Sequence, residues 1–143
     1  GKVVLDQFLH QDFTAILAWR DQHRCSLREA EKAVLGVDHA AIGGWLASRW
    51  QLPVTLQQGI AYHHDVSRTD AREVLPAIIH LADLLARTRG IGSGGDNIIP
   101  DLQESAWDRL RLVQADLEGI LRDLERDMHT VQDFIMMTQP ARS

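Results

Sequence analysis

Histidine is the residue type in this sequence that says most about chemistry. The 143 residues include seven histidines: His10, His23, His39, His63, His64, His80 and His129. His39 is followed at positions 3, 7 and 11 further on by Ile42, Leu46 and Trp50. This is the spacing of one helix face, so the His39 side chain is expected to point toward the protein interior.

Two neighbouring segments carry the same kind of signal. His63 and His64 follow Ile60 by three and four residues, and Asp83 shares a helix face with His80. Three helices are therefore expected to bring imidazole and carboxylate groups to a common interior. Such groups suit zinc, manganese or iron, and helical bundles build metal sites in their cores. The alternative is that each histidine is a core residue with a satisfied hydrogen bond.

The elements that position these residues are predicted to be helices. Leucine and alanine dominate the sequence, and strict alternation of apolar and polar residues is absent. Ser26 and Glu29 form a capping-box pattern, Gly36 ends that helix, and Asp38 can cap the next one. We predict helices over about 3–10, 12–22, 26–36, 38–50, 53–64, 70–89, 102–110 and 115–138. Pro76 predicts a kink or a restart within 70–89, and the adjacent pair Gly43 and Gly44 predicts a close helix contact.

The last helix, 115–138, has the clearest periodicity. Apolar residues spaced by four and three form a stripe: Leu117, Leu121, Leu124, Met128, Val131 and Ile135. The stripe predicts either a helix packed on its own domain or a dimerisation seam. We expect residues 1–143 to form a single domain, with 90–97 as an internal loop.

Composition excludes several classes of protein. The formal net charge is −5, which argues against a nucleic-acid partner, because phosphate binding needs clustered Lys and Arg. No segment is apolar and long enough to span a membrane. Cys25 is the only cysteine, so an internal disulfide and a cysteine-based zinc site are excluded, and a cytoplasmic location is expected. The apolar residues directly after Lys2 suggest that the sequence begins within a domain.

Two stretches of the sequence resemble a known family. Residues 31–65 read EKAVLGVDHAAIGGWLASRWQLPVTLQQGIAYHHD, and residues 77–96 read AIIHLADLLARTRGIGSGGD. In order and spacing they resemble the C-terminal half of an HDOD domain, a relative of the HD and HD-GYP phosphohydrolases. The resemblance covers residues 1 to about 124. Gly1 and Lys2 look like the last two residues of the His-Asp-Ile-Gly-Lys motif of that family.

The resemblance implies an all-α, compact, HD-domain-like bundle of about seven or eight helices. It also implies roles for five residues. Asp83 matches the terminal aspartate ligand of the HD metal site, and Lys2 resembles the lysine that faces substrate phosphate. His39, His63 and His64 look like the additional metal-binding histidines of HD-GYP enzymes.

The departures from the family pattern favour a non-catalytic role. No Gly-Tyr-Pro segment follows His64, and the His-Asp pair is absent from this chain. HDOD domains are generally regarded as non-catalytic signalling modules. The resemblance therefore implies a regulatory module without a cofactor, whose partners are other signalling domains or proteins or a second copy of the chain. The alternative is a metal-dependent phosphohydrolase using Fe, Mn or Zn, and a third reading is a purely structural helical dimer.

Overall fold

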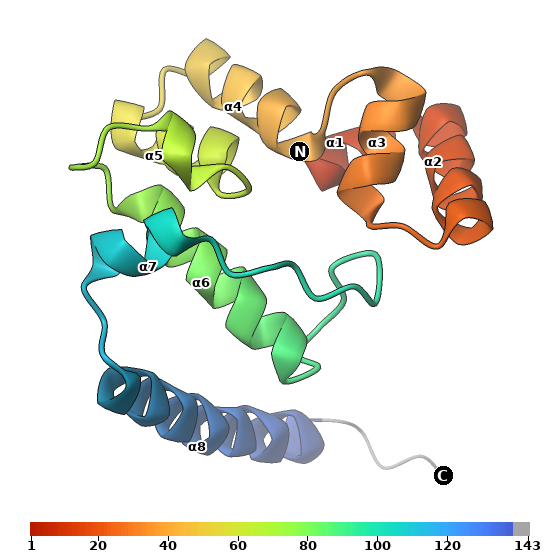
Figure 1. Ribbon diagram of the computed structural model, residues 1–143. Helices are drawn as coiled ribbons and strands as arrows, with labels where there is room; N and C mark the ends of the chain where they lie inside the picture. The colour runs from red at the N-terminus through yellow and green to blue at the C-terminus, as the bar shows by residue number, and fades with distance from the viewer. Residues whose placement is uncertain (139–143) are drawn as a thin grey trace, which may run out of the picture. The chain divides into compact units, whose positions relative to one another are not determined.

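The protein is helical throughout the part that the structure describes. The computed structural model describes the backbone of residues 1–138 and the side chains of residues 1–130. Over this range the chain forms eight α-helices and one 3-10 turn, and it contains no strand. The helices are α1 (Lys2–Phe8), α2 (His10–His23), α3 (Leu27–Leu35), α4 (His39–Arg49), α5 (Val54–Tyr62), α6 (Leu75–Thr88), α7 (Glu104–Leu110) and α8 (Gln114–Thr138), with the 3-10 turn η1 (Val66–Arg68) before α6 (Figure 1). The all-α prediction is confirmed.

The chain divides into two compact units, Gly1–Leu110 and Arg111–Ser143. The first unit holds α1 to α7 and all the candidate site residues. The second holds α8. The expectation that residues 1–143 form one domain stays a prediction.

The predicted helix caps are present. The Ser26 hydroxyl accepts a hydrogen bond from the Glu29 N–H (3.2 Å), and the Ser26 N–H donates to Glu29 Oε2 (2.8 Å). This reciprocal pair is a capping box, and it begins α3. Gly36 ends α3 in the left-handed region, with φ of 77°. Asp38 caps α4 by accepting the Ala41 N–H (2.9 Å). These caps fix the points at which α3 ends and α4 begins.

The helix predicted over 70–89 is shorter than expected. α6 begins at Leu75, with Pro76 in its first turn. Proline has no N–H, and its fixed φ suits the first turn, where that N–H would have no partner. Residues 70–73 form a turn instead, in which Asp70 accepts hydrogen bonds from the N–H groups of Arg72 and Glu73. The predicted restart at Pro76 is correct, and the predicted helix before it is wrong.

The glycine pair in α4 lies where α4 approaches α5. A Cβ added at Gly44 would lie 2.6 Å from the Ala61 Cβ, and one added at Gly43 would lie 2.7 Å from the Ile60 Cγ2. No side chain fits at either position without movement of α5. The predicted close contact is confirmed, and it holds the histidines that follow α5 near the start of α4.

Two small clusters of buried apolar residues anchor the first unit. Ile16 from α2 packs with Leu27 and Ala30 from α3. Val66 from η1 packs with Ala77 from α6 and Ala106 from α7. Burial of apolar surface at these contacts stabilises the two ends of the unit, and the candidate site lies on the elements between them.

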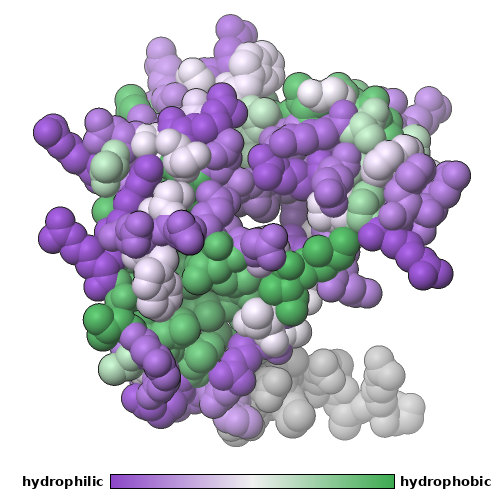
Figure 2. Space-filling view, viewed as in Figure 1, coloured by the Kyte–Doolittle hydropathy of each residue, from purple (hydrophilic) through white to green (hydrophobic). Residues whose placement is uncertain are grey.

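A segment without helical structure, residues 97–103, runs along α6. The Ile98 carbonyl accepts a hydrogen bond from an Arg87 Nη1 (3.0 Å), and the Gln103 N–H donates to His80 Nε2 (3.2 Å). Ile98, Ile99 and Leu102 of this segment and Ile78 of α6 are exposed. Figure 2 shows hydrophobic side chains gathered over this part of the surface.

The stripe of α8 can be followed as far as Met128. Leu117, Leu121, Leu124 and Met128 are all partly buried, whereas most of the residues between them are exposed. Val131 and Ile135 lie outside the residues whose side chains are described. The choice between packing on the domain and a dimer seam stays a prediction. None of the described helices is long and apolar enough to cross a membrane.

The contact between α4 and α5 predicts an unusual effect on stability when a glycine of α4 is replaced by alanine. In an open helix, Gly→Ala stabilises by up to about 1 kcal/mol. At Gly44 the added methyl group meets Ala61, so we expect Gly44→Ala to lower the free energy of unfolding by about 1–3 kcal/mol. Urea unfolding followed by circular dichroism measures the change.

Gly119 in α8 is the matched control, because the nearest atom to an added Cβ is Arg122 Nη2 at 4.0 Å. Gly119→Ala should leave stability unchanged or raise it. A Gly44→Ala protein as stable as the parent would contradict the close contact.

Candidate functional site

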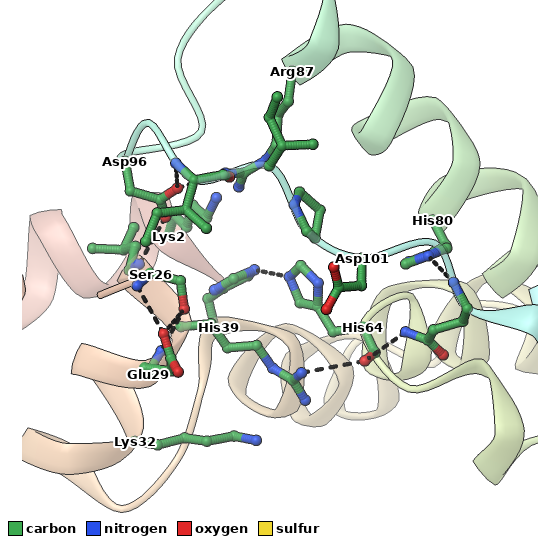
Figure 3. A pocket seen from close by; sticks show the side chains of 16 residues that line it. Lys2, Ser26, Glu29, Lys32, His39, His64, His80, Arg87, Asp96 and Asp101 are labelled. Atoms are coloured by element: carbon green, nitrogen blue, oxygen red, sulfur yellow. Dashed lines mark hydrogen bonds and ion pairs between the residues drawn. The ribbon is translucent and has the colours of Figure 1, made fainter. Parts of the chain in front are cut away.

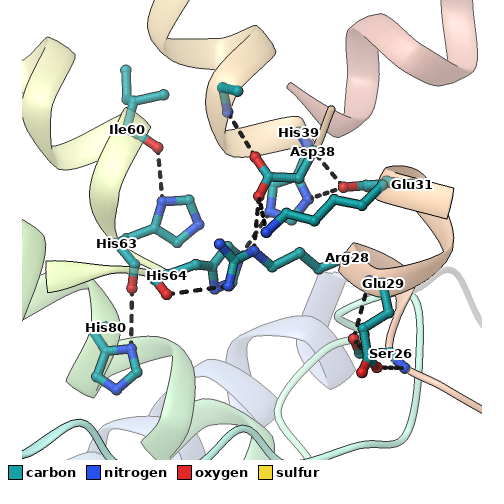
Figure 4. A network of polar contacts seen from close by, with 12 residues as sticks. Ser26, Arg28, Glu29, Glu31, Asp38, His39, Ile60, His63, His64 and His80 are labelled. Carbon is teal, nitrogen blue, oxygen red and sulfur yellow. Dashed lines mark hydrogen bonds and ion pairs between the residues drawn. The ribbon is translucent and has the colours of Figure 1, made fainter. Parts of the chain in front are cut away.

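Three histidines from two segments converge in the first unit. His39 is the first residue of α4, His63 follows the last residue of α5, and His64 comes next. One ring nitrogen from each of the three lies within 4.8 Å of the others. The rings of His63 and His64 have centroids 4.0 Å apart, and those of His39 and His64 are 4.9 Å apart (Figure 4). The structure therefore brings together the three histidines that the sequence singled out.

Asp83, the fourth candidate ligand, is paired with an arginine of its own helix. Its Oδ2 accepts a hydrogen bond from Arg87 Nε (3.1 Å), one turn along α6. Among the described residues, the group of possible ligands consists of the three histidines and does not include Asp83. The charge of Asp83 also acts on His63, where it opposes the lowering of the pKa by burial, so the predicted role of Asp83 as a metal ligand stays a prediction.

His80 supports the cluster from α6. It is buried, and its Nε2 accepts the Gln103 N–H, so its Nδ1 carries the proton and donates to the His63 carbonyl (3.0 Å). Both ring nitrogens of a neutral imidazole are thereby used. His80 therefore holds the backbone of His63 in place and offers no free nitrogen to a ligand.

Glu31 of α3 is a residue of the site that sequence analysis missed. Its side chain is fully buried. Its Oε2 accepts both the backbone N–H of His39 (2.8 Å) and the His39 Nδ1–H (2.6 Å). The sequence spacing could have indicated this role. Glu31 follows the inward-facing Leu27 by four residues and so lies on the buried face of α3.

The hydrogen bonds fix which nitrogens face one another. The Nδ1–H of His39 donates to Glu31, and the Nδ1–H of His63 donates to the Ile60 carbonyl (2.8 Å). Their Nε2 atoms therefore face the cluster, where the Nε2 atoms of His39 and His64 lie 3.0 Å apart. Outer acceptors that orient a histidine in this way are typical of metal-binding sites. The three imidazoles fit a transition metal as part of a ligand set, without a carboxylate among them.

Burial favours the neutral form of His63 and His64. The pKa of His64 is lowered to about 2, first by burial and then by the nearby charges of His63, His39 and Arg28. The pKa of His63 is also lowered, mainly by burial. Neutral imidazole is the form that binds metal or exchanges hydrogen bonds with another ring.

An ion pair joins α3 to the His64 segment. Arg28 Nε donates to Asp38 Oδ2 (2.8 Å), and Arg28 Nη1 donates to the His64 carbonyl (3.2 Å). Lys32 Nζ lies 3.6 Å from the same Asp38 oxygen. Burial alone would raise the pKa of Asp38, but the hydrogen bonds from Arg28 and the Ala41 N–H, with the charges of Arg28 and Lys32, hold it at about 2.

His39 and His64 face a cavity of about 400 Å³ (Figure 3). Lys2 also lines this cavity, but its Nζ donates to the Gly94 carbonyl (2.7 Å). Asp96, next to that loop, accepts hydrogen bonds from the Leu27 N–H (2.7 Å) and from Arg87 (2.7 Å). The lysine expected to face phosphate therefore helps to hold the 90–97 loop against α1.

Comparison with known proteins identifies this region. The HDOD domain family matches residues 1–66. The match covers 66 of the 143 residues. The matched HDOD residues include Glu31 and all three converging histidines, whereas Asp83 lies outside them.

The fold of the chain is also that of a solved HDOD structure. The crystal structure of an HDOD domain protein with unknown function from Geobacter sulfurreducens superposes with a TM-score of 0.70 at 21% identity. The alignment covers 86% of this chain and 45% of that one, so this chain spans less than half of the length of that protein. No match was found among curated proteins.

The ligand set predicts weak metal binding. The Nε2 atoms of His39 and His64 are hydrogen-bonded to each other (3.0 Å), so a metal ion must first break that bond and turn the rings. We expect the chain, purified without added metal salts, to retain no stoichiometric transition metal. Elemental analysis by mass spectrometry measures this, and one equivalent of metal that is lost in His63→Ala would contradict the expectation.

The Asp38 ion pair predicts a defined acid response. The pKa of Asp38 in the folded protein, about 2, lies below its ordinary value of 3.8, so its stabilising effect is complete above pH 4 and is lost as the pH falls toward 2. Asn keeps an oxygen for the Ala41 N–H but removes the charge. Asp38→Asn should therefore lower the free energy of unfolding at pH 7 by up to about 2 kcal/mol and flatten its change between pH 4 and pH 2.

The control is Asp123→Asn, which removes an ion pair with Arg126 (3.0 Å) whose two side chains are both exposed. This change should have little effect on stability. Denaturant unfolding across the pH range compares the two variants. Equal effects of the two changes would contradict the assignment of Asp38.

Proposed function

We propose that this chain is part of a non-catalytic, regulatory HDOD module that acts by binding a protein or a ligand. This proposal rests on one observation. Polar groups that a hydrolase would need for substrate or metal are already bonded to other groups of the chain. Lys2 is bonded to the Gly94 carbonyl, and Asp83 is paired with Arg87. Hydrolysis through a metal-activated water needs a firmly held metal with an open coordination position. Here the Nε2 atoms of His39 and His64 are hydrogen-bonded to each other (3.0 Å), and a metal ion would have to break that bond.

The partners of this module would be other signalling domains or proteins, or a second copy of the chain. The net charge of −5 supports a partner other than nucleic acid. The single cysteine supports a place in the cytoplasm, where thiols stay reduced.

A metal-dependent phosphohydrolase is the second candidate, and one observation favours it. The Nε2 atoms of His39, His63 and His64 converge, and the rings of His39 and His63 are oriented by outer acceptors. In that case the three histidines would hold iron, manganese or zinc, which activates water for attack on phosphorus.

Hydrolysis assays separate the two candidates. The chain is incubated with cyclic dinucleotides and with a phosphomonoester in the presence of manganese, iron or magnesium. We expect turnover at background, and the same background in His64→Ala. His129→Ala, which changes an exposed histidine of α8, is the control. Turnover that disappears in His64→Ala or Asp83→Ala and persists in His129→Ala would overturn the regulatory proposal.

A further inference from the structure

A second cavity, of about 620 Å³, is lined by residues of α3, α4 and α5 and by none of the three converging histidines. It lies between the end of α3, the turn at 36–38, and the helices α4 and α5. The residues that matter for the argument are Lys32, Trp45, Val54, Gln58, Tyr62 and Arg68. Neither the HDOD resemblance nor the histidine site assigns a role to it.

The walls of this cavity are aromatic and aliphatic. Trp45 of α4 is 63% exposed and Val54 of α5 is 64% exposed, although both line the cavity. On the α5 side, the Arg68 guanidinium lies 5.3 Å from the centre of the Tyr62 ring. The small residues Gly44 and Ala61 lie between these walls, where α4 and α5 are in contact. The exposed indole of Trp45 lies next to small residues, which leaves room for a flat aromatic ring to pack against it.

The cavity also carries two kinds of polar group. Gln58 Oε1 is buried, and it has no hydrogen-bond partner among the described residues. Because this atom has almost no accessible surface, the Gln58 side chain must rotate toward the cavity before an N–H of a bound molecule can donate to it. At the end near α3, Lys32 is half exposed beside Asp38, so its ammonium can also meet an anion.

We propose that this cavity binds a small planar aromatic molecule that carries an N–H donor and an anionic group. The ring packs against Trp45, the N–H donates to Gln58 Oε1, and the anion lies near Lys32. The volume and the combination of apolar walls with a few polar groups are those of small-molecule sites. The proposal stands apart from the regulatory role, because the histidines take no part in this cavity.

The probe for the test is indole-3-acetate, which combines a flat aromatic ring, an N–H and a carboxylate. Isothermal titration calorimetry of the whole chain should show saturable binding of one probe molecule. Trp45→Ala should weaken binding about tenfold, since loss of an aromatic contact with its buried area is worth about 1.4 kcal/mol. Gln58→Leu and Lys32→Gln should each weaken it severalfold, and only Lys32→Gln should reduce the salt dependence.

Trp50→Ala is the matched control. Trp50 directly follows α4 and is 68% exposed, much like Trp45, but it does not line the cavity. It should leave the affinity within about twofold of the parent. Circular dichroism checks that each variant is folded.

Three results would overturn the proposal. They are binding without saturation, equal weakening by Trp45→Ala and Trp50→Ala, and an affinity unchanged by both Gln58→Leu and Lys32→Gln. This test uses no hydrolysis assay. A failure of the regulatory proposal would therefore leave the proposal for this cavity unaffected.

Discussion

The first unit depends on the contact between the buried carboxylate of Glu31 and His39. A carboxylate without water is costly unless it is hydrogen-bonded, and Glu31 Oε2 receives two N–H groups from one residue. The backbone bond fixes the start of α4 against α3, and the ring bond turns the imidazole so that its Nε2 faces His64. Removing either partner would leave the other buried without its bond, which is the expensive case for a polar pair. The position of the histidine cluster therefore follows from this one contact.

The backbone of His63 and His64 is held from two sides. Arg28 of α3 donates to the His64 carbonyl, and His80 of α6 donates to the His63 carbonyl. Both bonds end on backbone carbonyls, so they connect this segment to α3 and α6 without using the imidazole side chains. The position of the segment is therefore fixed independently of what the two rings bind.

The local features of this protein could be predicted from its sequence, and the long-range ones could not. The Ser26 capping box and the glycine pair in α4 follow from neighbouring residues, and both are present. The pairing of Asp83 with Arg87 could also have been predicted, because the two are four residues apart on one helix. Lys2 is different, since its partner Gly94 is 92 positions away and only the folded chain brings the two together. Glu31 was missed because a charged residue on an inward face is usually assigned to the surface.

The two cavities share a charged wall. Arg28 and Lys32 line both of them, and both side chains are paired with Asp38, which also caps α4. An added negative charge near Lys32 would compete with Asp38 for the same cations. Arg28 also donates to the His64 carbonyl, so this one side chain contacts both the second cavity and the segment that carries His63 and His64.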